Sequence, residues 1–236
     1  MSIWTNIGAL ASRMPVPSLT AMVETLRSYF GVDPELRRQV AFSVAMIALS
    51  AKMAKADGVV TDAEVGAFRQ IFQIPADEER NVARLYNLAR QDVAGFESYA
   101  QQMANLCGSG GPNCMMLEDI LDGLFHIAKS DGLIHEHELG YLRRVAEIFE
   151  IEESHFEQIL ARHAVGGEGN PFRVLGVSPD ASRDEVTSRY RQLAAENHPD
   201  RLMGRGFPAE FIRIANDRMA AINAAYAAIE ASWRFV

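Results

Sequence analysis

The chain has 236 residues, of which 48% are hydrophobic and 23% are charged, a composition typical of folded proteins with one or two cores. Its formal net charge of −8 argues against a nucleic-acid-binding protein, because such proteins need a basic face. Residues 170–236 contain nine arginines and no lysine against eight acids, whereas residues 1–169 contain 14 basic and 23 acidic residues. An acidic body and a nearly neutral C-terminal part indicate two units with different roles.

No segment of the sequence is typical of secretion or of a membrane span. The N-terminus lacks a basic stretch ahead of an apolar one. The longest apolar run, Val40–Met53, contains Ser43 and Lys52, and it is shorter than the roughly 18 residues of a spanning helix. Cys107 and Cys114 flank a glycine-rich loop that would let them form a disulfide, but reduced thiols are the favoured interpretation without a secretion signal. We therefore predict a cytoplasmic protein without a membrane span.

The first 163 residues are predicted to be helical. Residues 1–16 form a short apolar lead-in with helical spacing, which we expect to dock on the protein's own body. Residues 17–163 then show apolar residues three and four apart, and they show no convincing alternation of the kind that predicts a strand. The predicted helical runs are Leu36–Ala56, Asp62–Phe72, Ala76–Ala89, Phe96–Cys107, Met116–Ser130, Glu136–Phe149 and Ser154–His163.

This helical body contains an internal repeat. The segment Lys55–Val60 matches Lys129–Ile134 at an offset of 74 residues, and Glu64 falls on Glu138. Each copy predicts a helix, an Asp-Gly turn and a second helix, so two hairpins related by pseudo-symmetry are expected to pack together. The duplicated Lys-x-Asp-Gly pattern resembles the TerB family, an all-helical fold linked to tellurite resistance. The resemblance covers roughly residues 35–160.

The repeat also places acidic and histidine side chains near its two turns. Oxygen ligands suit hard divalent cations, so a metal site is one interpretation. The favoured interpretation has no metal: the aspartates set turns, the glutamates cap helices and the histidines lie at a helix start. The residues concerned are Asp57, Glu64, Asp131, Glu138, His135 and His137.

A linker and a second helical unit follow. Residues 164–169 contain three glycines and are predicted to be the linker to residues 170–236. Asn170 can cap a short helix that begins with Pro171 and stops at Gly176. Ser182 and Glu185 have the spacing of a capping box, which predicts the start of a longer helix.

The longer helix and the last one, Ala209–Trp233, are predicted to form an antiparallel hairpin, because apolar residues repeat three and four apart along both. A residue that precedes proline is pushed out of the helical conformation. Pro199 therefore predicts that the longer helix, Arg183–Asn197, ends just before His198. His198 and Asp200 are then presented at the tip of the hairpin, on either side of a rigid proline.

Three roles are open to an exposed His-Pro-Asp sequence: a solvated helix end, an acid–base pair of an enzyme, or a docking loop. The acid–base role is disfavoured, because a hairpin tip offers no pocket and no third group to orient a substrate. A rigidly mounted carboxylate suits docking, since it presents one charge to a partner with little ordering entropy to lose.

Five separated segments of the C-terminal unit are similar to the J domain of DnaJ-type co-chaperones. The additional residues Leu202–Pro208, together with the TerB-like body, resemble the DjlA branch of that family. The five segments are Asn170–Val177, Glu185–Val186, Tyr190–Ala194, His198–Arg201 and Ile222–Tyr226.

The resemblance implies that the protein docks on a DnaK-type chaperone and stimulates its ATP hydrolysis without doing chemistry itself. The implied partner-binding residues are His198, Pro199, Asp200, Arg191, Gln192, Arg201 and Tyr190. Thr187, Gln192 and Glu196 stand where the family commonly has basic residues. We therefore expect weaker or more selective docking, helped by Arg189 and Arg205 as well as by Arg191 and Arg201.

The prediction from the sequence is thus an all-α co-chaperone that is not an enzyme and needs no cofactor or metal. Its acidic residues 17–163 are expected to bind clients, a regulator or a second copy of the chain, and it is expected to bind no nucleic acid. The alternative is a metal- or stress-responsive TerB-like binding protein with a weakly active J domain.

Overall fold

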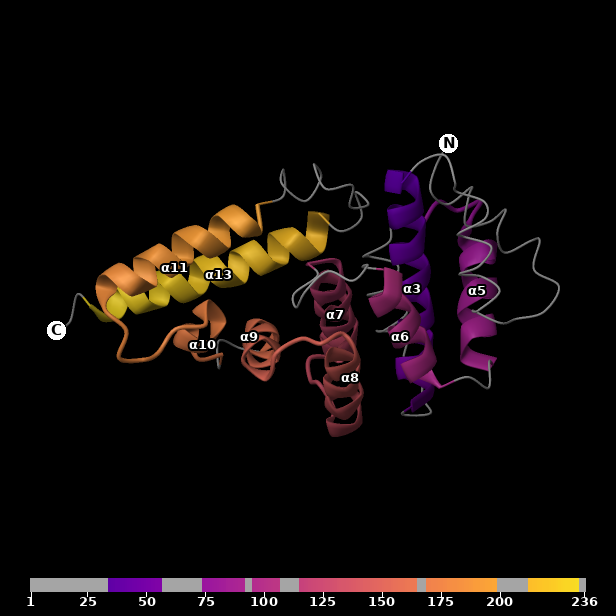
Figure 1. Cartoon of the computed structure of the whole chain (residues 1–236), viewed down its shortest axis with the longest axis horizontal. Coiled ribbons are helices and arrows are strands. Elements are labelled where there is room, and N and C mark those ends of the chain that lie inside the picture. Colours follow the sequence, from indigo (N-terminus) through magenta and orange to yellow (C-terminus); the bar gives the residue numbers. More distant parts are fainter. Residues whose placement is uncertain are drawn as a thin grey trace. The chain divides into compact units, whose positions relative to one another are not determined.

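A computed structural model describes residues 34–56, 74–91, 95–106, 115–164, 169–198 and 212–233. These residues are helical or lie in turns between helices, and no strand occurs among them (Figure 1). The chain divides into two compact units, Met1–Ile151 and Glu152–Val236. The predicted all-α fold is confirmed.

One helix forms the centre of the first unit. Among the described helices that follow it in this unit, α3 packs against α5, α6, α7 and α8 (Figure 1). The helices are α3 (Pro34–Ala56), α5 (Glu79–Gln91), α6 (Phe96–Leu106), α7 (Met115–Ala128) and α8 (Glu136–Ile148).

The sequence of α3 explains its central place. Its apolar run is buried along several consecutive turns, and even Ser43, Ser50 and Lys52 are nearly inaccessible to solvent. Ser50 donates its hydroxyl to the Met46 carbonyl at 2.6 Å, and the Lys52 ammonium lies 5.0 Å from the centre of the Tyr99 ring. A helix that is apolar on all sides is stable in water only when other helices cover it on all sides. None of the helices in the described ranges is long and apolar enough to cross a membrane.

The second Asp-Gly turn of the repeat closes as the sequence predicts. A short 3₁₀ helix, η1 (Lys129–Asp131), ends at Gly132 with φ of 100°, a left-handed conformation that glycine adopts without strain. Helix α8 then begins, and the backbone N–H of His135 donates to the Glu138 carboxylate at 2.8 Å. The first copy of the turn and Glu64 lie outside the described residues, as do Cys107, Cys114 and residues 1–16.

A small apolar core organises the second unit. Helices α11 (Arg183–Glu196) and α13 (Ile212–Ser232) lie side by side as the predicted hairpin, and α10 (Pro171–Leu175) packs across both (Figure 1). Helix α9 (Glu153–His163) packs against α10. The core residues are Val174, Leu175, Val186, Leu193, Ile222, Ala225 and Ile229.

Helix α9 belongs to this unit by its contacts. The Gln158 side chain is buried, and its Nε2 donates to the Val174 carbonyl at 3.0 Å. Ala161 packs against the hairpin core. The predicted domain boundaries, with a linker at residues 164–169, stay a prediction.

The predicted caps of the second unit are confirmed. The Asn170 side chain accepts from the Phe172 N–H at 3.0 Å, and Gly176 ends α10 with φ of 67°. At the start of α11, Ser182 and Glu185 form a reciprocal capping box. These local motifs hold both ends of the short turn between α10 and α11, and its Val177 and Ala181 pack against the core.

Candidate functional site: the end of helix α11

Helix α11 ends next to the proline, as the proline rule predicts. Asn197 is the C-terminal cap, with φ of −102° and ψ of 10°, and its N–H donates to the Leu193 carbonyl at 3.0 Å. His198, the next residue, is exposed. The remaining loop residues that the sequence predicts for docking, Pro199, Asp200 and Arg201, lie outside the described residues, as does Arg205.

The end of α11 is joined to α13 by a buried polar contact. Arg218 Nη1 donates to Asn197 Oδ1 at 2.9 Å, and both side chains are buried. Sequence analysis missed Arg218. A signal was present: Arg218 lies four residues before Ile222, on the apolar stripe of α13, where a charged side chain is unusual.

Two predicted docking residues lie exposed on α11. Arg191 and Gln192 face solvent about two turns before His198, and Gln192 Nε2 donates to Glu196 Oε1 at 2.9 Å. The structure therefore brings one cation and one amide to the same helix end as the loop. Glu196, half-buried in the last turn, adds a carboxylate to that end.

Tyr190 is tied to the opposite helix of the hairpin. Its ring stacks on Tyr226, with centroids 4.1 Å apart and an angle of 15° between the planes. Its hydroxyl donates to Asn223 Oδ1 at 3.1 Å. The side chain is half-buried, so it braces the hairpin while keeping one edge at the surface.

Two other arginines of α11 bond within the unit. Arg189 Nε donates to the Leu175 carbonyl at 3.2 Å, and Arg183 Nη2 donates to the Trp233 carbonyl at 3.1 Å. The Arg183 guanidinium also lies 5.2 Å from the centre of the Trp233 ring. Both cations therefore help to hold α11 against its neighbours, and Arg191 is the α11 arginine that faces solvent nearest to His198.

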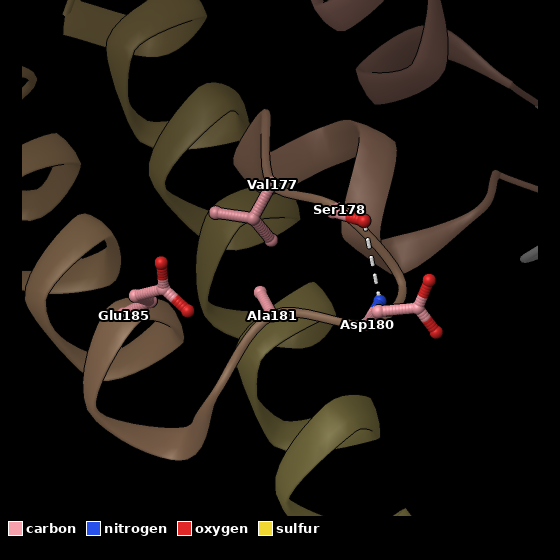
Figure 2. A pocket seen from close by; sticks show the side chains of 5 residues that line it. All are labelled: Val177, Ser178, Asp180, Ala181 and Glu185. Carbon is pink, nitrogen blue, oxygen red and sulfur yellow. Dashed lines mark hydrogen bonds between the residues drawn. The ribbon is translucent and has the colours of Figure 1, made fainter.

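A pocket of about 310 Å³ lies at the other end of the hairpin, between α10 and α11. Figure 2 shows the Ser178 hydroxyl turned to the Asp180 N–H, 3.3 Å away, and the Asp180 carboxylate turned away from Val177 and Ala181. The Glu185 carboxylate is engaged in the capping box, and its pKa is lowered chiefly by the hydrogen bond from the Ser182 backbone. The Glu185 carboxylate therefore serves the cap of α11, and at Asp180 it is the backbone N–H that bonds within the turn.

The acidic residues of the repeat show what their side chains do only in the second copy. Glu138 is buried and caps α8, as the favoured interpretation predicted. His135 and His137 are exposed near the start of α8. Within the described ranges, no group of three or more histidine, cysteine, aspartate or glutamate side chains gathers as metal ligands. Asp57 lies outside those ranges.

Comparisons with known proteins agree with this two-part architecture. The model of the family described as "Tellurite resistance protein TerB" matches residues 43–161, and the DnaJ domain model matches residues 170–232. The TerB match therefore ends within α9. No solved structure matches the chain.

Several curated relatives share one name, co-chaperone protein DjlA. The chain is 28% identical to the co-chaperone protein DjlA of Photobacterium profundum, over 80% of this chain and 76% of the relative. It is 27% identical to DjlA of Legionella pneumophila, over 80% and 75%, and 24% identical to DjlA of Escherichia coli K12, over 82% and 80%.

The fold and these matches define a J-domain protein with a helical domain ahead of the J unit. The chain belongs to the TerB family over its helical body, its C-terminal unit matches the DnaJ domain, and the chain as a whole is similar to the DjlA co-chaperones.

The predicted cytoplasmic location does not hold. It rested on the lack of a signal or a spanning run in the sequence, whereas the DjlA relatives extend beyond the part that this chain matches. The described helices show only that none of them spans a membrane. The cytoplasmic assignment is therefore withdrawn.

Proposed function

We propose that the C-terminal unit docks on a DnaK-type chaperone through the loop that begins at His198 and thereby stimulates its ATP hydrolysis. One observation carries this proposal: within a matched DnaJ domain, His198 stands exposed directly after the capped end of α11. An exposed group on a rigid support costs little ordering entropy when a partner binds it.

The surface around this loop supplies the other contacts. Arg191 and Gln192 are exposed on the same helix, and Tyr190 is held in place by its stacking on Tyr226. Pro199, Asp200 and Arg201 complete the docking set on the strength of the family resemblance. In the second half of α11, Arg191 is the exposed arginine, and a face with few cations favours selective docking over strong, purely electrostatic attraction.

The unit would act on its partner's conformational equilibrium. A ligand shifts such an equilibrium only by binding one state more tightly than the other. The docking loop would therefore bind the hydrolysis-competent state of the partner better, and no bond is made or broken on this chain. The acidic TerB-like unit would bind clients or a regulator, which brings them to the partner.

The test is the change His198→Gln in the full chain. We expect stimulation of the cognate DnaK-type ATPase to fall by roughly thirtyfold or more, the size of effect of losing a central interface residue. Helicity and the unfolding midpoint should not change, because His198 is exposed.

A matched control is available on the other unit. His137→Gln makes the same exchange at an exposed position on α8 and should leave stimulation unchanged. Full stimulation by the His198→Gln chain would show that the loop is not the docking site.

A further inference from the structure

The end of α11 is fastened by a polar pair whose partners come from two helices. Arg218 is 4% exposed and Asn197 is 6% exposed, although His198, which directly follows Asn197, faces solvent. The Arg218 guanidinium donates to the Asn197 amide oxygen at 2.9 Å across 21 residues of sequence. A contact of this kind ties a point on α13 to the last residue before the docking loop.

The Asn197 amide has a second bond that fixes its orientation. Its Nδ2 donates to the Leu193 carbonyl at 2.8 Å, and the Asn197 backbone N–H donates to the same oxygen at 3.0 Å. Turning the amide would therefore break its bond to α11 and its bond to Arg218 together. Both bonds form in only one orientation of the last turn of α11 against α13. Any rotation of that turn would therefore lose them.

Stability alone is a poor explanation for this pair. Leu193, Ile214 and Ala215 are buried around this end of the hairpin, so an apolar pair of similar volume would fit the same surroundings. Replacing buried polar pairs by apolar ones is often neutral or stabilising. Hydrogen bonds differ from apolar contacts in being directional, and direction matters most where an exposed residue must leave the helix at a set angle.

We propose that Asn197 and Arg218 are positioning residues for the docking loop, and that their hydrogen bond sets the angle at which His198 leaves α11. This inference rests on the proposed function of the loop. Neither residue needs to touch the partner, because both are buried. Losing the bond lets His198 leave α11 at several angles, so only a fraction of chains is ready to dock and the apparent affinity falls by that fraction.

The test uses the full chain with Arg218→Met, which keeps an unbranched side chain and removes the donor. We expect the concentration for half-maximal ATPase stimulation to rise about tenfold, the effect of one lost hydrogen bond to a charged group. Maximal stimulation at saturation should stay within about twofold, since chains in the docking position still act normally. The ring signals of His198 in a ¹H–¹³C spectrum should shift or broaden.

Ile229→Val is the control for a purely structural effect. Ile229 is 1% exposed and lies on α13 at the end far from the loop. The Ile229→Val and Arg218→Met chains are compared at a temperature at which both are fully folded. Ile229→Val should leave the half-maximal concentration and the His198 signals unchanged. The proposal would be overturned if Arg218→Met and Ile229→Val raised the half-maximal concentration equally. It would also be overturned if Arg218→Met left that concentration unchanged.

Two further chains make the result independent of folding and of the proposed function. If Arg218→Met does not fold, Arg218→Lys keeps the cation and a donor and should raise the half-maximal concentration by about threefold; an unchanged value overturns the positioning role. His198→Gln is measured beside them. Normal stimulation by that chain refutes the docking loop itself, whereas its loss beside an unaffected Arg218→Met chain refutes only the positioning pair.

Discussion

The two ends of the α11–α13 hairpin are closed by different kinds of contact. At the end near α10, Leu175 is fully buried, Ser182 and Glu185 cap α11, and Arg183 bonds to Trp233. At the loop end, the buried bond from Arg218 to Asn197 crosses the hairpin next to His198.

The difference shows how a small unit divides its tasks. Apolar contacts and caps at the α10 end contribute stability, and the apolar contacts tolerate small rotations because the hydrophobic effect has no direction. The hydrogen bond between Arg218 and Asn197 at the loop end is directional, and it fixes the orientation of the helix end that presents His198. Changes at the α10 end should therefore lower the unfolding free energy and leave docking intact. Changes at the loop end should chiefly weaken docking.

Ile222→Ala should have the largest effect, because it lies between the two ends and supports both. Ile222 is fully buried in the hairpin core, and emptying its site should lower the unfolding free energy by about 2–5 kcal/mol. Urea unfolding followed by Trp233 fluorescence, in a Trp4→Phe background, measures the loss. Ala228→Ser, at an exposed position of α13, should stay within about 0.5 kcal/mol of the parent chain.

Gly176→Ala should weaken only the α10 end. Gly176 has φ of 67°, and an added Cβ would lie 3.1 Å from Gln158 Nε2, so the Gln158 side chain would have to shift slightly. The left-handed conformation alone costs an L-residue about 1–2 kcal/mol. We expect a lower unfolding midpoint with an unchanged half-maximal concentration for ATPase stimulation.

A glycine in the first unit provides the matched control for that change. A Cβ added at Gly140 meets nothing within 4 Å, and Gly140 lies inside α8. Gly140→Ala should stabilise the chain by about 0.5–1 kcal/mol, because alanine favours the helix. A loss of docking by Gly176→Ala, with folding intact, would contradict the division of tasks between the two ends.

The smallest expected effect is the acid titration of the cap of α11. The pKa of Glu185 is lowered by hydrogen bonds from Ser182, so the cap is fully formed above the unfolded pKa of about 4.5 and is lost as the pH falls through the folded value. The ¹³C shift of the Glu185 carboxyl should titrate below 4.5. Ser182→Ala removes the hydroxyl bond and keeps the backbone bond, so it should move the midpoint upward by part of the shift. An unmoved midpoint would show that the Ser182 hydroxyl does not contribute to the shift.

Much of the α10 end could be predicted from the sequence. The caps at Asn170, Gly176 and Ser182 depend on residues within four positions of each other, and all three form as expected. The grouping of α9 could not be predicted. Its helical pattern resembles those of the helices before it, and the periodicity of a helix does not predict which helix it packs against. The structure shows the grouping, because Gln158 bonds to Val174 across a glycine-rich segment.

The sequence by itself determined the all-α fold, the end of α11 before the proline and the exposure of His198, because propensities, caps and the proline rule act over a few residues. Only the tertiary structure decided which charged groups surround that histidine. It directs Arg183 and Arg189 into bonds with Trp233 and Leu175, and it buries Arg218 against Asn197. These contacts join residues 14 to 50 positions apart, and their partners are chosen by how the helices pack.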